Sequence, residues 1–235
     1  MERILIVNAD DFGQSPGINR GVKRGHALGV VTSASLMVRW PTVAEAADYA
    51  RSNTTLSLGL HVDFGEWTFD AETYAWLPLH DVLPTHDVDA VATEVARQLA
   101  RFRALVGRDP THLDSHQHAH REEPLRTCMA GLAKQLGVPL RGHAPTVAYC
   151  GAFYGQSNRG YPYHAAIGVD GLQSLLRALP PGVTELGCHP GELDDLPGMY
   201  RVERAIELRT LCDPLIRATL DDLAIRLRSF SDLPR

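Results

Sequence analysis

The chain has 235 residues, of which 44% are hydrophobic, which suits one globular domain spanning residues 1–235. Its formal net charge of −5 and the lack of a basic stripe argue against a nucleic-acid-binding protein. No run approaches the roughly 18 unbroken apolar residues of a membrane span, and the first predicted strand leaves no room for a secretory leader.

The cysteines are widely spaced and form no C-x-x-C pair; they are Cys128, Cys150, Cys188 and Cys212. This pattern is typical of reduced thiols without a chemical role. Together with the lack of a leader, it favours a cytoplasmic protein.

The first predicted strand begins with four apolar residues, at positions 4–7, and three of them are β-branched. Such a run is typical of a strand buried on both faces of a parallel sheet. It is followed closely by the adjacent carboxylates Asp10 and Asp11, and ligands of α/β proteins bind at this end of strands. The pair could instead cap the next helix, but Ser15 and Pro16 already provide an N-cap and a first-turn proline.

The rest of the chain alternates predicted helices with predicted strands. Helices are expected at 16–28, 41–51, 87–106, 124–136, 171–179, 202–211 and from 214, and strands at 31–38, 56–64, 111–115, 138–141, 183–188 and 225–230. This alternation predicts the α/β class, with a parallel sheet covered by helices. Because the polar stretches fall at strand ends, a distorted (β/α) barrel is favoured over an open sheet.

Two stretches interrupt this alternation. Residues 65–87, which include Trp67 and Trp76, are interpreted as an insertion over the open end of the fold. Their aromatic side chains either line a binding groove or pack as a small separate cluster. Residues 142–168 are predicted to be a long loop, a feature that is usually functional or mobile, and Tyr154 and Arg159 within it are candidate sugar or phosphate contacts.

The segment from Thr111 to His120 places five polar side chains at even positions: His112, Asp114, His116, His118 and His120. On a strand each step of two residues advances about 6.6 Å, so one ion cannot bind them all. We predict a strand that ends at Ser115. His116 at its end is then the best ligand candidate, whereas Asp114 is better placed to support a ligand. A surface histidine run that binds no ion is the alternative.

A catalytic divalent cation needs ligands from several strand ends and a free position for water or substrate. Asp11, His61 and His116 would provide one carboxylate and two imidazoles. The ion would lower the pKa of its water and polarise a substrate oxygen. Asp10 would accept a proton from that water, and His189 would protonate the leaving group. Taken singly, His61 and His189 are equally consistent with structural roles. Zinc and magnesium are the favoured ions.

Four motifs carry a family resemblance: residues 8–13 (Asn-Ala-Asp-Asp-Phe-Gly), 59–61 (Gly-Leu-His), 111–120, and 188–191 (Cys-His-Pro-Gly). With them in view, the chain closely resembles the YdjC-like carbohydrate deacetylases. This family includes the chitooligosaccharide deacetylases and the deacetylases of hopanoid biosynthesis. Residues 153–155 and 211–214 also resemble family features, so the resemblance spans nearly the whole chain.

The resemblance implies a distorted (β/α) barrel related to the polysaccharide deacetylases. It implies a metal-dependent hydrolase that removes an N-acetyl group from an N-acetylated amino sugar or short oligosaccharide. Asp11, His61 and His116 would bind one divalent metal ion, Asp10 would be the general base, and His189 would be the late catalytic histidine. Family members are often dimers, so a homodimer is considered. Two alternatives stay open: a metal-dependent phosphoesterase, and a non-catalytic carbohydrate-binding protein on the same fold.

Overall fold

The computed structural model describes residues 2–70, 72–80, 82–157, 159–193 and 199–233. The strands are β1 (Arg3–Phe12), β2 (Ser33–Leu36), β3 (Ser57–Val62), β4 (Glu66–Asp70), β5 (Ala75–His80), β6 (Leu113–Ser115), β7 (Val147–Cys150), β8 (Gly182–Cys188) and β9 (Ile225–Leu227). The helices are α1 (Pro16–Leu28), α2 (Val43–Ser52), α3 (Val88–Val106), α4 (Leu125–Leu136), α5 (Val169–Ala178), α6 (Val202–Leu211) and α7 (Pro214–Asp222). Three short 3₁₀ helices are η1 (His116–Arg121), η2 (His164–Ile167) and η3 (Phe230–Asp232).

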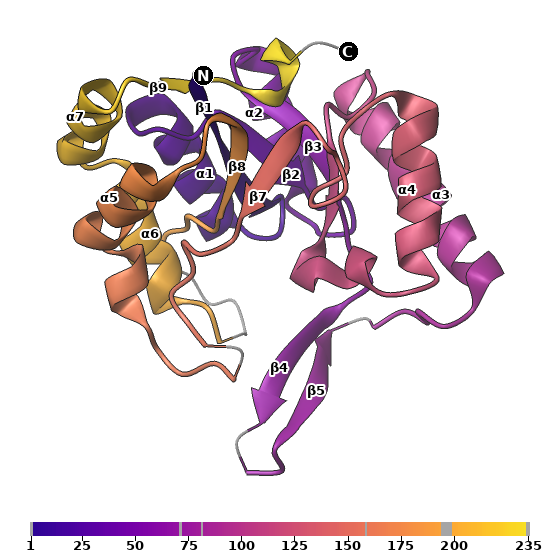
Figure 1. The fold of residues 1–235 in the computed structure, drawn as a ribbon. Coiled ribbons are helices and arrows are strands. Elements are labelled where there is room, and N and C mark those ends of the chain that lie inside the picture. The colour runs from indigo at the N-terminus through magenta and orange to yellow at the C-terminus, as the bar shows by residue number, and fades with distance from the viewer. Residues whose placement is uncertain (1, 71, 81, 158, 194–198, 234–235) are drawn as a thin grey trace.

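Seven of the described strands form one sheet in the order β6-β3-β2-β1-β8-β7, with β9 beside the beginning of β1. Every neighbouring pair in this sheet is parallel. Helices surround it: α3 packs on α4 near β6, and α5 packs on α7 on the opposite side (Figure 1). The predicted α/β fold is confirmed. Within the described chain β6 and β7 are the two edges, so the barrel is not closed by a strand ladder.

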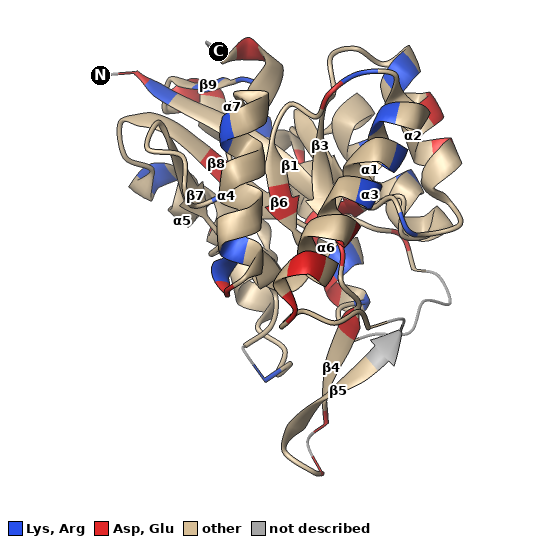
Figure 2. Ribbon diagram, turned by 90° about the vertical axis from the view of Figure 1, so that its right-hand side faces the viewer, with Lys and Arg blue, Asp and Glu red and all other residues tan. Residues whose placement is uncertain are grey.

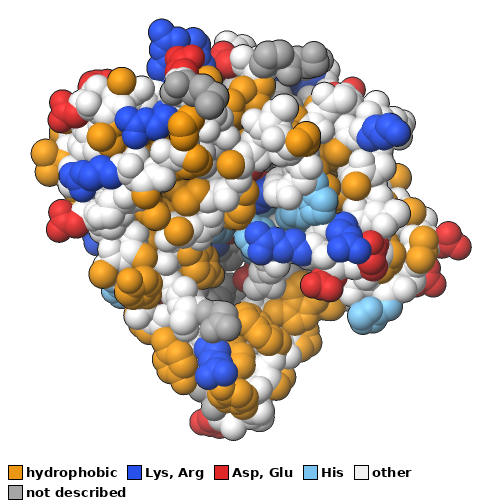
Figure 3. All heavy atoms as spheres, in the orientation of Figure 1, with side chains coloured by type: hydrophobic (Ala, Val, Ile, Leu, Met, Phe, Trp, Pro, Cys, Tyr) orange, Lys and Arg blue, Asp and Glu red, His pale blue; other side chains and the backbone are white. Residues whose placement is uncertain are grey.

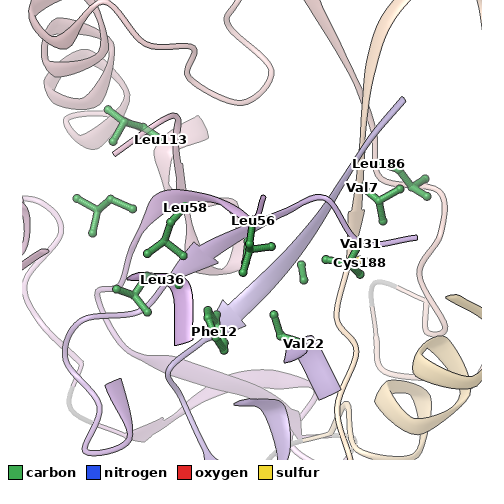
Figure 4. Close-up of a cluster of buried hydrophobic side chains, with 14 of the residues drawn as sticks. Val7, Phe12, Val22, Val31, Leu36, Leu56, Leu58, Leu113, Leu186 and Cys188 are labelled. Atoms are coloured by element: carbon green, nitrogen blue, oxygen red, sulfur yellow. The ribbon is translucent and has the colours of Figure 1, made fainter. Parts of the chain in front are cut away.

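The core lies between the sheet and its helices. Val7 and Phe12 of β1 are fully buried, as expected for a strand covered on both faces (Figure 4). Helix α1 begins where predicted, because the Ser15 side chain accepts a hydrogen bond from the backbone N–H of Ile18 at 3.1 Å. A Cβ atom on Gly21 of α1 would lie only 2.4 Å from Gly191, so glycine here lets the helix approach the segment after β8.

Two predictions in the middle of the chain are wrong. Residues 142–168 were predicted to be loop throughout, but they contain β7, which pairs with β8. The four-residue run Val-Ala-Tyr-Cys carries little local signal, and its strand conformation comes from this tertiary pairing. Residues 138–141 were predicted to be a strand, but they form only an isolated bridge between Leu140 and Leu113. Pro139 lacks the N–H group that a regular ladder needs.

The predicted insertion at 65–87 forms an antiparallel hairpin of β4 and β5, which projects from the rest of the fold (Figure 1). The predicted helix that follows it is confirmed: α3 begins after Asp87, whose side chain accepts from the backbone N–H of Ala90. Among the described helices, none combines the length and the apolar composition needed to cross a membrane.

Candidate active site

The C-terminal end of β1 departs from regular strand geometry. Its register against β2 shifts between Ala9 and Phe12, and Asp11 has a φ of 63°. Aspartate is one of the few residues that adopts this left-handed conformation at modest cost. Neighbours on a regular strand point to opposite faces, but here Asp10 and Asp11 line the same cleft. Local backbone strain of this kind is typical of functional sites.

Asp11 and His61 are the next-to-last residues of β1 and β3, and His116 directly follows β6. The three side chains meet. Asp11 Oδ1 lies 3.3 Å from His61 Nε2 and 3.0 Å from His116 Nδ1. Each residue offers one ligand atom within 4.8 Å of the other two, and all three are buried. One carboxylate and two imidazoles at this spacing are a suitable donor set for a divalent cation.

Asp114 supports His61 from the side away from Asp11. The His61 Nδ1 atom lies 2.8 Å from Asp114 Oδ1, which leaves Nε2 directed toward Asp11. The Ser35 hydroxyl donates to the other Asp114 oxygen at 2.7 Å, so the carboxylate is itself fixed. A histidine that binds a metal through one nitrogen is commonly oriented in this way through the other.

The carboxylates around Asp11, His61 and His116 stabilise the protonated, positively charged form of both imidazoles. Burial opposes protonation of His61, yet the carboxylates of Asp114 and Asp11 raise its pKa to about 10. Burial likewise opposes protonation of His116, but Glu66 and Asp11 hold its pKa well above the ordinary value. The surplus negative charge that stabilises two imidazolium ions would also stabilise a bound cation. The residues present therefore fit a divalent metal ion.

A second group of potential ligands overlaps the first and consists of Asp10, His61 and Asp114. Both of its carboxylates already share the charge of Arg141, which lies 2.6 Å from Asp10 Oδ2 and 2.7 Å from Asp114 Oδ2. Asp11 also has an arginine partner, Arg204, at 2.6 Å from Oδ2, but its Oδ1 faces both imidazoles. The group that contains Asp11 offers two imidazoles and an oxygen directed toward them, so it is the better candidate for a cation.

Arg141 is buried among three carboxylates. It donates two hydrogen bonds to Asp10, at 2.6 and 2.7 Å, and one to Glu185 at 2.8 Å, in addition to its contact with Asp114. Figure 2 shows an acidic residue on β6. Although burial alone would raise the pKa of Asp10, Arg141 lowers it, so Asp10 is ionised at neutral pH.

The Arg141→Met variant is expected to lose about 3–5 kcal/mol of unfolding free energy, because it leaves buried carboxylates without their counter-charge. Arg51→Met is the matched control: this arginine pairs with Asp48 and its side chain is 48% exposed. We expect it to lose at most about 1 kcal/mol. Urea denaturation at pH 7 measures both losses, and equal losses would contradict the structural role of Arg141.

His189 lies directly after β8 and faces Asp10. Its Nε2 atom is 3.7 Å from Asp10 Oδ2, and its Nδ1 atom is 3.9 Å from Glu207 Oε1. Burial lowers the pKa of His189 to about 4. Burial also raises the pKa of Glu207 to about 8, even though the His189 backbone N–H and the Tyr200 hydroxyl both donate to its carboxylate.

The raised pKa of Glu207 predicts a pH-dependent stability. Between about pH 4.5 and 8 the folded protein retains a proton on this carboxyl that the unfolded chain releases. The resulting stabilisation is fully present below pH 4.5 and is lost as the pH rises through 8. Glu207→Gln replaces the carboxyl by a neutral amide that does not titrate. As the pH rises from 4.5 to 8, we therefore expect the variant to gain stability relative to wild type. Thermal unfolding at several pH values measures the difference, and a difference independent of pH would contradict the assignment.

The two predicted substrate contacts lie in different places. Tyr154 lines the cleft, with its ring centroid 5.5 Å from that of His189 and 4.5 Å from that of Tyr200. Arg159 does not occur among the described residues that line this cleft, and its guanidinium lies over the ring of Tyr74 at 4.9 Å.

The remaining histidines of the run serve different purposes. His112 is buried and stacks on Phe230 with ring centroids 3.9 Å apart. His120 is also buried, with Nδ1 2.6 Å from the Ser115 hydroxyl. His118 lines the cleft. Of the five polar side chains at even positions, only His116 and His118 line the cleft.

Five charged residues at the site were not singled out from the sequence: Arg141, Glu185 and Glu207, described above, and Glu66 and Arg204. Glu66, the first residue of β4, has Oε2 2.9 Å from His116 Nε2. Arg204, from α6, donates to Asp11 Oδ2 at 2.6 Å. Arg204 lies in an ordinary helical pattern and Glu66 lies in the irregular insertion, so neither carried a recognisable signal. Glu185 did carry a recognisable signal, because a charged residue within an otherwise largely apolar strand is expected to have a buried partner.

A model of YdjC-like proteins matches residues 4–222 of the chain. The chain belongs to the YdjC-like family. The resemblance expected from the four motifs is thereby confirmed. This YdjC-like chain is 32% identical over 270 residues to the chitooligosaccharide deacetylase of Serratia marcescens. The match covers 99% of the chain and 100% of that relative.

Two solved structures are similar to this YdjC-like protein. A protein from Enterococcus faecalis V583, provisionally described as a cellobiose-phosphate cleavage protein, superposes with a TM-score of 0.78 at 24% identity, over 100% of both chains. A family 4 carbohydrate esterase from Streptomyces lividans, in complex with acetate, superposes with a TM-score of 0.54 at 13% identity, over 96% of this chain and 91% of that chain. These similarities support the barrel-like fold.

Proposed function

We propose that this YdjC-like protein is a metal-dependent hydrolase that removes an N-acetyl group from an N-acetylated amino sugar or short oligosaccharide. The observation that carries the proposal is the meeting of Asp11, His61 and His116 beside Asp10 and His189 in one cleft. The name of the Serratia marcescens relative, a chitooligosaccharide deacetylase, supports the choice of reaction and substrate class. A cytoplasmic location and a homodimer stay predictions from the sequence.

Asp11, His61 and His116 would hold the cation. When bound, a divalent ion supplies a Lewis acid that acidifies water and polarises the acetamide carbonyl. Zinc and magnesium are the two ions proposed: one carboxylate and two imidazoles suit zinc, whereas magnesium prefers oxygen ligands and would depend on the carboxylate and on water.

Asp10 acts as the general base. It is ionised at neutral pH and its two oxygens are held by Arg141 at 2.6 and 2.7 Å, so its orientation is fixed. It accepts a proton from the water molecule that adds to the acetamide carbon. His189 Nε2 lies 3.7 Å from Asp10 Oδ2, close enough to receive this proton after a small movement.

His189 then delivers the proton to the amine nitrogen as the C–N bond breaks. Because burial keeps the free imidazole neutral, with a pKa of about 4, the histidine can take up the proton that Asp10 has removed from water. The products are acetate and a free amino sugar. One water molecule is consumed: its oxygen becomes part of the acetate, and the proton that Asp10 removes from it reaches the amine nitrogen.

The cleft suits a sugar. It has a volume of about 650 Å³ and is lined by aromatic side chains as well as the charged groups described above. Sugar-binding clefts need polar groups for the hydroxyls and flat apolar surfaces for the C–H faces of the rings, and tyrosine and tryptophan provide both.

The test is a screen for acetate release from N-acetylated mono- and disaccharides, with Zn²⁺ or Mg²⁺ added, and with phosphate release from sugar phosphates measured in parallel. We expect acetate release that a chelator abolishes and added metal restores. Phosphate release without acetate would replace the proposal by a phosphoesterase. Tight sugar binding with neither product would replace it by a non-catalytic binding protein.

A further inference from the structure

Glu66 is a charged residue at the base of the β4–β5 hairpin, and the proposed function does not use it. Hydrophobic side chains gather over the surface of this projecting hairpin (Figure 3). The Glu66 side chain, in contrast, is only 17% exposed, and its Oε2 atom lies 2.9 Å from His116 Nε2. A carboxylate that is largely withdrawn from water needs polar partners within the protein. The partner that Glu66 has is a proposed metal ligand.

Neighbouring segments hold Glu66 in this position. The Gln14 side chain donates to Glu66 Oε2 at 2.9 Å, and the backbone N–H of Gln14 donates to the Asp11 carbonyl at 3.0 Å. Directly after Glu66, the Trp67 carbonyl accepts a hydrogen bond from the Gln117 side chain at 3.0 Å. The start of β4 is therefore fixed both against the segment that follows β1 and against η1.

The two ring nitrogens of His116 face different carboxylates. Nδ1 lies 3.0 Å from Asp11 Oδ1, the same oxygen that lies 3.3 Å from His61 Nε2. Nε2 lies 2.9 Å from Glu66 Oε2. Glu66 itself is not one of the described residues that form the group of potential ligands around Asp11. A cation shared by Asp11, His61 and His116 therefore faces Nδ1 of His116, while Nε2 stays directed at Glu66.

A neutral imidazole that binds a cation through one nitrogen carries its hydrogen on the other nitrogen. In His61 the hydrogen belongs on Nδ1, where Asp114 Oδ1 lies 2.8 Å away to accept it. In His116 it belongs on Nε2, where Glu66 Oε2 is the acceptor. The two histidines therefore have the same kind of carboxylate partner but opposite tautomers, and they offer one Nε2 and one Nδ1 atom to the cation.

We propose that Glu66 is a positioning residue of the metal site: its carboxylate accepts the hydrogen of His116 Nε2 and so leaves Nδ1 to bind the cation. This inference rests on the metal site of the proposed function. A carboxylate partner of this kind orients a ligand histidine and raises its basicity. The inference also makes the β4–β5 hairpin part of the metal site, because moving the start of β4 would remove the acceptor from His116.

Calorimetric titration of Zn²⁺ into Glu66→Leu and Glu66→Gln tests this hydrogen bond. Loss of a supporting partner lowers metal affinity roughly 10–100-fold, and we expect this loss for Glu66→Leu. The amide oxygen of Glu66→Gln can still accept the Nε2 hydrogen, so this variant should recover most of the affinity. Wild-type affinity in Glu66→Leu overturns the inference, as do equal losses in the two variants.

Asp70→Asn is the matched control for charge. Asp70 ends β4 of the same hairpin, and its carboxylate accepts hydrogen bonds from the backbone N–H and the hydroxyl of Thr73. The variant removes one negative charge from the hairpin and leaves the contact between Glu66 and His116 in place. We expect it to bind zinc with wild-type affinity. A loss as large as that of Glu66→Leu would mean that charge alone, without the hydrogen bond, explains both results.

The tautomers can be observed directly in zinc-loaded wild-type protein whose histidines are labelled with ¹⁵N. Nuclear magnetic resonance distinguishes a ring nitrogen that carries hydrogen from one that binds zinc, and the spectrum of His116→Ala assigns the signals. We expect hydrogen on Nε2 and zinc on Nδ1 of His116, and the reverse for His61. Zinc on Nε2 of His116 overturns the inference.

Neither measurement depends on turnover, so the inference and the proposed function can fail separately. Zinc on Nδ1 of His116 without acetate release from any substrate would support the role of Glu66 and contradict the deacetylase function. Acetate release with zinc on Nε2 of His116 would support the deacetylase function and overturn the role of Glu66.

Discussion

The Asp10→Asn variant is expected to bind its divalent cation with unchanged stoichiometry and to lose kcat for acetate release by about 10²–10⁴-fold. Asparagine has nearly the same size as aspartate but cannot accept a proton from water. Arg141 keeps its contacts with Asp114 and Glu185 in this variant, so the buried cluster retains counter-charges. Metal content measured by mass spectrometry, together with kcat under saturating substrate, checks both halves of the prediction.

Asp63→Asn is the matched control. Asp63 is equally buried, and its carboxylate contacts Arg39 at 3.4 Å and the indole N–H of Trp40 at 2.9 Å, away from the described cleft lining. We expect this variant to lose stability but to keep kcat. If Asp10→Asn retained kcat within tenfold of wild type, or if Asp63→Asn lost as much, Asp10 would not be the general base.

The Asp11→Asn variant is expected to lose the cation and, with it, acetate release. Asp11 Oδ1 lies within 3.3 Å of one imidazole and 3.0 Å of the other, so this carboxylate is the centre of the proposed donor set. A neutral amide is a poorer ligand and removes the charge that attracts the ion. The affinity loss should exceed the roughly 10–100-fold that loss of a supporting partner costs. Zinc titration by calorimetry measures it.

His118→Ala is the control for this second variant. His118 lines the same cleft but is not one of the proposed ligands. We expect it to bind one cation per chain with wild-type affinity. Loss of metal binding in His118→Ala and not in Asp11→Asn would reassign the metal site.

Much of the fold could be predicted because its signals are local. The apolar run before Asp10 is typical of a buried strand, and the Ser15 cap with Pro16 places the start of α1 at the correct residue. The predicted spans of α1 and α6 agree with the structure residue for residue. In the histidine run, the spacing along a strand was enough to rule out a single ion bound by all five side chains. It left His116 at the strand end, and the structure places His116 next to Asp11.

The residues that were missed depend on tertiary contacts. Strand β7 exists because β8 offers it a hydrogen-bonding edge, and its four residues carry no periodic pattern of their own. Glu66 and Arg204 reach the site from an irregular insertion and from the last third of the chain. No spacing rule links them to Asp11. Arg159 was selected for its charge, yet it packs over Tyr74, because a long arginine side chain can cover an aromatic face.

The most direct test of the proposed metal site is acetate release from the N-acetylglucosamine dimer as chelator-treated protein is resupplied with Zn²⁺ or Mg²⁺. We predict that activity rises from zero and saturates at one equivalent of metal per chain for wild type, and that Asp11→Asn stays inactive throughout. Wild-type rates of acetate release from metal-stripped Asp11→Asn protein would contradict the convergence of Asp11, His61 and His116 on a single catalytic ion.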